Sequence, residues 1–216
     1  MPFVNGRFYA NPAHGHALER ARIAEDGFSA PDRSDLGQEQ GGHWVTIDSR
    51  RVLVDRGQAG RVSRARRDKI AVTARKYNGS TDWGFAKRKD NFASGTNKCN
   101  KFVYDVTKEA GATATVTGSD GKSRAPLAGE WADPNTHIPG WRVLGPNETP
   151  QPGDVAAYKL PGGGTSFSGH SGIVTDVEAN GRVHAVAAHS DVVGPDDKFN
   201  STRDRAVTYR RFEGGR

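Results

Sequence analysis

One cysteine stands where a nucleophile for amide chemistry could be activated. Cys99 is the only cysteine, and it closely follows Thr96 and Asn97, either of which can cap a helix. In the first turn of that helix, unpaired backbone N–H groups and the helix dipole lower the pKa of a thiol from its free value of about 8.5. The same N–H groups could hold an oxyanion as a carbonyl is attacked. Because free cysteines are often inert core residues, Cys99 alone does not establish a site.

His170 supplies the base that such a thiol needs. It opens the segment Gly169-His170-Ser171-Gly172-Ile173-Val174, which predicts a strand directly after a glycine-rich loop. A ring nitrogen at that position can face a cleft. A base within hydrogen-bond reach of the thiol makes the thiolate–imidazolium pair of cysteine catalysis. We therefore predict Cys99 as the nucleophile and His170 as its base.

A predicted hairpin supplies candidates for the residue that orients His170. The Asn-Gly pair at residues 180–181 predicts a two-residue turn. Continued along both strands, the pairing from that turn places His170 opposite Asp191. Since alternate residues share a face of a strand, His189 and Asp191 lie on the face of His170. Either could accept the Nδ1–H of His170 and fix its tautomer. His189 is slightly preferred, because strand pairing frays toward Asp191.

The elements that carry these residues predict an α+β fold. A helix from about residue 96 has one apolar face, formed at helical spacing by Cys99, Phe102, Val103, Val106 and Ala110. A shorter helix precedes it at residues 68–77. Four β-prone runs then follow at residues 154–160, 170–177, 183–189 and 206–212. A helix followed by an antiparallel meander implies a nucleophile-bearing helix packed on an antiparallel sheet.

The chain divides into two regions of different composition. Residues 1–65 contain few large apolar side chains outside a predicted hairpin at residues 44–54, and no catalytic constellation. We predict that residues 1–65 form an irregular accessory or targeting extension and that residues 66–216 form the catalytic domain. The arginine-rich run at residues 61–67 is interpreted as a solvated face.

Composition narrows the class of protein. A net charge of +6 and a pI of about 9.6 favour anionic partners, which include nucleic acid, anionic lipid and bacterial cell wall. The single cysteine excludes an intramolecular disulfide, and His14 and His16 lack the cysteine partners of a structural zinc motif. The Gly162-Gly163-Gly164 run lacks the lysine and following helix of a phosphate loop. No apolar run is long enough to span a membrane. We expect a monomer without metal or organic cofactor.

Four segments together resemble the NlpC-type and CHAP families of papain-like cell-wall hydrolases, over about residues 70–212. They are Trp83-Gly84, Asn97-Lys98-Cys99-Asn100-Lys101-Phe102-Val103, Pro152-Gly153-Asp154-Val155 and Gly169-His170-Ser171-Gly172-Ile173-Val174. The resemblance implies a papain-like core in which Cys99 attacks an amide carbonyl of peptidoglycan, with His170 protonating the leaving amine. It also implies that Trp83 helps to shape the substrate cleft.

The chain departs from this pattern around the nucleophile. NlpC-type sequences usually have Asp-Cys-Ser where this chain has Lys98-Cys99-Asn100, and no glutamine lies at the expected distance before Cys99 to complete a papain-style oxyanion hole. These departures leave the subfamily and the bond that is cut open.

Three functions remain open from the sequence. The first is hydrolysis of peptidoglycan, whose carboxylate-rich stem peptides suit a basic protein. The second is a papain-like enzyme that acts on a protein, as a deamidase, protease or acyltransferase. The third is a nucleic-acid or wall-binding module in which the cysteine and histidine are incidental.

The first residues bear on where the protein acts. Residues 1–7 lack the basic start, apolar stretch and cleavage site of a secretory signal. We expect a protein made in the cytoplasm and delivered to the periplasm or a target-cell wall by a secretion system or by phage lysis. Such a protein would be an antibacterial toxin or a lysin, and a toxin would have an immunity partner.

Overall fold

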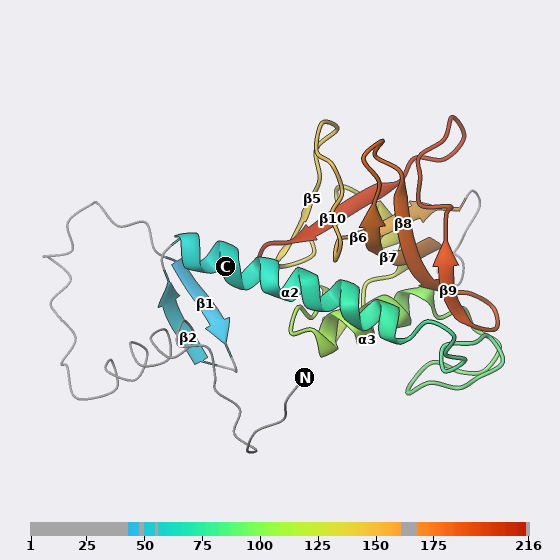
Figure 1. The fold of residues 1–216 in the computed structure, drawn as a ribbon. Coiled ribbons are helices and arrows are strands. Elements are labelled where there is room, and N and C mark those ends of the chain that lie inside the picture. The colour runs from blue at the N-terminus through green and yellow to red at the C-terminus, as the bar shows by residue number, and fades with distance from the viewer. Residues whose placement is uncertain (1–42, 48–49, 55, 161–167, 215–216) are drawn as a thin grey trace, which may run out of the picture. The chain divides into compact units, whose positions relative to one another are not determined.

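The computed structural model describes residues 43–47, 50–54, 56–160 and 168–214 (Figure 1). A two-stranded hairpin comprises β1 (His43–Ile47) and β2 (Arg50–Val54), and the predicted hairpin at residues 44–54 is thus confirmed. Three helices follow in the rest of the described chain: α2 (Arg56–Lys76), α3 (Cys99–Glu109) and α4 (Ala128–Ala132). None of the helices in these ranges is long and apolar enough to cross a membrane. Residues 1–42 of the predicted extension lie outside the described residues.

Six strands form one antiparallel sheet in the order β5-β10-β6-β7-β8-β9. Their bounds are β5 (Trp141–Val143), β6 (Val155–Lys159), β7 (Gly169–Val177), β8 (Val183–Ala188), β9 (Val193–Asp196) and β10 (Thr208–Phe212). A small separate ladder joins β3 (Val116–Thr117) to β4 (Ser123–Arg124). The α+β class and four of the predicted strands are confirmed, whereas β5 and β9 were missed.

Helix α3 packs its apolar face on the sheet. Phe102, Val103 and Val106 are fully buried, and they belong to one core cluster with Ile173 of β7 and Val186 of β8. The predicted apolar face is therefore the one that meets the sheet. Since Cys99 lies at the first position of this helix, the packing fixes the position of its side chain relative to β7.

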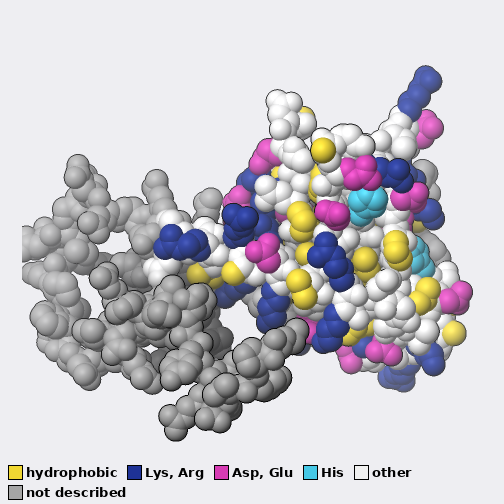
Figure 2. Space-filling model, in the orientation of Figure 1, with side chains coloured by type: hydrophobic (Ala, Val, Ile, Leu, Met, Phe, Trp, Pro, Cys, Tyr) yellow, Lys and Arg dark blue, Asp and Glu magenta, His cyan; other side chains and the backbone are white. Residues whose placement is uncertain are grey.

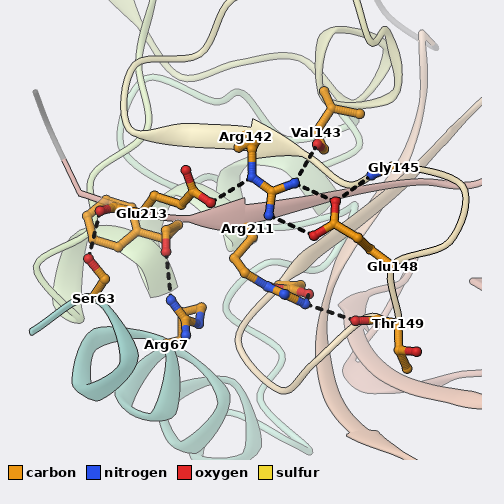
Figure 3. Close-up of polar contacts among 11 residues, drawn as sticks. Ser63, Arg67, Arg142, Val143, Gly145, Glu148, Thr149, Arg211 and Glu213 are labelled. Atoms are coloured by element: carbon orange, nitrogen blue, oxygen red, sulfur yellow. Dashed lines mark hydrogen bonds and ion pairs between the residues drawn. The ribbon is translucent and has the colours of Figure 1, made fainter. Parts of the chain in front are cut away.

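Helix α2 is longer than the predicted helix at residues 68–77 and is continuous through the predicted domain boundary at residue 65. Its buried positions in the first half carry small side chains, Ala59 and Ser63, which give no apolar signal in the sequence. Ser63 Oγ donates to the carbonyl oxygen of Glu213 at 2.7 Å, and Arg67 donates to that of Phe212 at 3.0 Å (Figure 3). These bonds attach α2 to the C-terminal end of β10.

Ion pairs and hydrogen bonds of two arginines hold β5 and its neighbour β10 to nearby loops. Arg142 on β5 donates to Glu148 at 2.5 Å and to Glu213 at 2.6 Å, as Figure 3 shows. Arg211 on β10 donates to the carbonyl oxygen of Thr149 at 3.0 Å and to Asp154 at 2.8 Å. These contacts connect the loop before β6 to the last strand.

The Pro-Gly-Asp segment before β6 has a structural role. Asp154 is fully buried and accepts hydrogen bonds from Arg211, which keeps the buried carboxylate paired. Gly153 has a φ of +89°, and a Cβ at this position would lie 2.2 Å from the carbonyl oxygen of Arg67 in α2. Only glycine therefore fits where this turn meets the helix.

We expect Gly153→Ala to lower the free energy of unfolding by about 2–4 kcal/mol, because the new methyl group displaces the α2 backbone and φ is positive. Gly181→Ala is the matched control, since Gly181 has a φ of +86° with no atom within 4 Å of an added Cβ. The free energy of unfolding of the control should fall only by the cost of a left-handed conformation for alanine, about 1–2 kcal/mol. Urea denaturation followed by tryptophan fluorescence measures both, and equal losses would contradict this role of Gly153.

Candidate active site

Cys99 is the first residue of α3 and is 6% exposed. The predicted caps, Thr96 and Asn97, are not used: Lys98 precedes the helix and makes no side-chain cap bond. Lys98 is itself buried, and its ammonium group donates to the carbonyl oxygens of Gly84 and Thr96 at 3.3 and 2.9 Å. The loop before the nucleophile is therefore held by a buried lysine rather than by a polar cap.

His170 connects the thiol to a carboxylate. Its Nε2 atom lies 2.9 Å from Oδ2 of Asp196, whose side chain is 2% exposed. The imidazole also forms a hydrogen bond with the Cys99 thiol. Because Asp196 occupies Nε2, the nitrogen left for the thiol is Nδ1. Cys99, His170 and Asp196 thus form a continuous chain from α3 through β7 to β9, with the arrangement of a catalytic triad.

The partner of His170 differs from both predicted candidates. Asp191 is exposed at the tip of the turn between β8 and β9. The backbone N–H of His189 closes this turn by donating to the carbonyl oxygen of Val192 at 3.0 Å. His189 does share the face of His170, with ring centroids 6.0 Å apart, but its Nδ1 lies 3.9 Å from Asp196 Oδ2. The carboxylate that accepts the bond belongs to β9, which the sequence did not reveal, and it meets Nε2 rather than Nδ1.

Two irregularities explain why the predicted register was wrong. The hairpin loop has three residues rather than two, because Glu178 N donates to the Arg182 oxygen and Gly181 takes a φ of +86°. A bulge at Thr175 then shifts the pairing of β7 with β8 again. The carbonyl group of this bulged residue accepts a hydrogen bond from Arg75 of α2. Together the two shifts move the pairing of β7 with β8 by two residues. The predicted residues of β8 therefore stay on the same face of the sheet, but a different residue lies opposite each residue of β7.

Electrostatics at the site favour a thiolate–imidazolium pair. Burial raises the pKa of the Cys99 thiol, but the hydrogen bond and charge of His170, together with the backbone N–H of Ser171, lower that pKa below its ordinary value. Burial lowers the pKa of His170, but Asp196 and Cys99 outweigh it and raise that pKa to about 9. The pKa of Asp196 stays below its ordinary value because its bonds to His170 and to the Lys198 N–H outweigh burial.

These shifts predict the pH range of any catalysis by this pair. The lowered Cys99 pKa keeps the thiolate present below the ordinary thiol pKa, and the raised His170 pKa keeps the imidazolium present up to about pH 9. We expect kcat/KM to rise with pH as the ion pair forms and to fall as pH passes through about 9. A pH–rate profile on a soluble substrate measures this, and an alkaline limb near the ordinary histidine pKa would contradict it.

Aromatic rings hold His170 in place. Phe199 stacks on the imidazole with centroids 5.3 Å apart and an interplanar angle of 12°, and Tyr158 contacts its edge at 5.8 Å. Gly172 makes room for this stack, since a Cβ there would lie 2.7 Å from the Phe199 ring. The glycine two residues after His170 is thus explained by packing, and Phe199 and Tyr158 are site residues that the sequence analysis missed.

The triad opens onto a cleft of about 770 Å³. Cys99, His170 and His189 line it, and so do Tyr158 and Lys198. Lys198 is exposed at this cleft and provides a positive charge near the nucleophile. A volume of this size holds a ligand of several residues or sugar units.

Trp83, predicted to shape the cleft, lies in the core instead. It is 2% exposed, packs edge-on against Tyr77 and Phe102, and donates from Nε1 to Asp105 at 2.9 Å. It is not among the residues that line the cleft. A structural role in orienting α3 therefore replaces the predicted contact with substrate.

Residues 87–189 match the family model described as the CHAP domain. This part of the chain is similar to a CHAP domain. Cys99, His170 and His189 fall inside the matched range, and Asp196 lies just beyond it. A CHAP domain indicates a papain-like hydrolase that acts on peptidoglycan as an amidase or endopeptidase, which agrees with the α+β architecture. The NlpC-type part of the resemblance has no such support. No curated protein and no solved structure matches the chain.

Proposed function

We propose that this CHAP protein hydrolyses a peptide or amide bond of peptidoglycan, with Cys99 as nucleophile, His170 as acid and base, and Asp196 as the residue that orients His170. The observation that carries the proposal is the Cys99–His170–Asp196 chain, which lies at a cleft inside a domain of a wall-hydrolase family.

The reaction proceeds in two steps from this geometry. The Cys99 thiolate attacks the scissile carbonyl carbon, and the oxygen gains negative charge near the backbone N–H groups at the start of α3. The C–N bond breaks as the Nδ1 proton of His170 passes to the leaving amine, which leaves a thioester. Water then attacks the thioester while His170 removes one of its protons, and the acid product leaves with the thiolate restored. Asp196 orients the ring in both steps and stabilises the imidazolium whenever His170 is protonated.

A protein substrate is the second candidate for the same triad. The same triad can attack an amide bond of either substrate, so the triad alone does not distinguish the two. The CHAP match and the positive charge of Lys198 at the cleft favour a carboxylate-bearing stem peptide. Figure 2 shows Lys and Arg side chains with few acidic ones along α2, a feature that a nucleic-acid module would share. The Cys99–His170–Asp196 chain at the cleft favours an enzyme over such a module, because nucleic-acid binding needs no such chain.

Digestion of purified peptidoglycan tests the proposal. Wild-type protein should release soluble fragments whose masses identify the cut bond, with new amino groups if a stem peptide or cross-bridge is cut. A parallel digestion of denatured casein addresses the protein-substrate alternative. Release from casein with intact peptidoglycan would overturn the proposed substrate and leave a cysteine peptidase of another kind.

The route to the wall stays a prediction. Delivery by a secretion system or by phage lysis, a role as an antibacterial effector, and an immunity partner were inferred from the sequence and follow from no contact in the structure.

A further inference from the structure

Three side chains near the nucleophile form a cluster with the composition of a metal site. His170, His189 and Asp196 each present one ligand atom, and these atoms lie within 4.8 Å of one another. Two imidazoles and a carboxylate are ligands that Zn²⁺ and similar cations accept. The sequence predicts no metal site, because its single cysteine has no ligand-spaced partner and no sequence pattern places Asp196 beside two histidines.

Two of the three spacings between these atoms are close to what a metal would require, and the two histidine nitrogens, which lie within 4.8 Å of each other, would approach further on binding. A tetrahedral ion with bonds of about 2.0–2.2 Å separates its ligand atoms by about 3.3–3.6 Å. The His170 Nε2 to Asp196 Oδ2 distance is 2.9 Å, and the His189 Nδ1 to Asp196 Oδ2 distance is 3.9 Å. Movements of a few tenths of an ångström, one outward and one inward, bring both distances into that range.

The surroundings position the cluster and leave it reachable. The other carboxylate oxygen of Asp196 accepts the Lys198 N–H at 2.9 Å, and Phe199 stacks on His170, so both ligands are oriented from outside the cluster. His170 and His189 line the cleft, which gives an ion a path and leaves a fourth position for water. The triad chemistry makes no use of His189.

We propose that His170, His189 and Asp196 bind a transition-metal dication of the Zn²⁺ class, and that this binding inhibits the enzyme. The inhibition, unlike the binding, depends on the proposed function. A metal on Nε2 replaces the hydrogen bond that orients His170. The remaining ring proton sits on Nδ1, and its transfer to the leaving amine would produce an unfavourable metal-bound imidazolate. The ion also occupies the cleft beside Cys99.

Zinc binding to four proteins tests the site without relying on catalysis. Competition with a chromogenic chelator should give the same affinity for wild type and Cys99→Ala, because the thiol is not a ligand. His189→Gln should weaken this binding at least about 100-fold. His184→Gln is the matched control, since His184 is half exposed and pairs with Glu178 away from the site; it should bind as wild type does. Zinc that binds elsewhere in the chain would bind equally to all four proteins.

Either of two results would overturn the site: equal zinc binding by His189→Gln and wild type, or a loss of binding in Cys99→Ala. Co²⁺ provides a second readout, because a thiolate-to-cobalt charge-transfer band would show that Cys99 holds the metal. If the site is correct, Zn²⁺ should suppress peptidoglycan hydrolysis in wild type and His184→Gln, and a chelator should restore it. His189→Gln should need at least about 100-fold more zinc for the same fractional inhibition. The expected binding pattern without any hydrolysis would refute the proposed function and leave the metal site standing.

Discussion

Replacing Cys99 with alanine should reduce kcat/KM for a soluble peptidoglycan fragment by about 10⁵–10⁶-fold, because no group remains to form the thioester. Cys99→Ser should be almost as inactive, since a hydroxyl group at this position is not ionised near neutral pH. His170→Ala should be similarly impaired, and the double variant Cys99→Ala/His170→Ala should be little worse than either single one. Such non-additivity is expected of residues that act as one unit.

The Cys99 variants keep the apolar packing of α3, so their thermal unfolding should stay close to that of wild type. A folded Cys99→Ala protein that retains more than a small fraction of wild-type kcat/KM would contradict the assignment of the nucleophile.

Asp196→Ala should lower kcat by about 10²–10⁴-fold, because the imidazole loses both its orientation and the charge that stabilises its protonated form. The alkaline limb of the pH–rate profile should also move to lower pH, since the hydrogen bond to Asp196 helps to raise the His170 pKa to about 9. Asp196→Asn should keep the ring orientation but lose the charge, so it should restore part of kcat without restoring the alkaline limb.

Asp191→Asn is the matched control, because Asp191 is exposed at the tip of the β8–β9 turn. Its kcat and pH profile should equal those of wild type. If Asp191→Asn lowered kcat as much as Asp196→Ala does, the observed geometry would be contradicted. Asp191, which the predicted hairpin register placed opposite His170, would then be favoured as the residue that orients it.

Periodic apolar patterns predicted the parts of the fold that position the thiol and the imidazole. The apolar residues of α3 follow from the burial of one helix face, and the β-prone run of β7 follows from a strand that is buried on both faces. Cys99 and His170 could therefore be found from the sequence. The third residue could not. Asp196 ends a strand that contains Gly194 and Pro195, and both residues are unfavourable in strand interiors, so β9 has no strand signature.

Small buried residues and long-range contacts account for the other differences between the predicted and the observed structure. The first half of α2 buries Ala59 and Ser63, which carry no apolar pattern, and its arginine-rich sequence resembles a solvated segment. Trp83 was placed by resemblance, and only the structure shows its bond to Asp105 inside the core. The bulge at Thr175 depends on Arg75 of another element, which no local pattern contains.

The pH dependence of Cys99 alkylation reports on the thiolate–imidazolium pair itself, because the reaction needs no substrate. Iodoacetamide labelling of wild type should already be fast well below the ordinary thiol pKa of about 8.5. In His170→Ala the reaction should become fast only near or above that pKa, because burial then acts on the thiol without its partner. Equal profiles for the two proteins, each rising near the ordinary thiol pKa, would show that Cys99 is not activated by His170 and would contradict the thiolate–imidazolium pair.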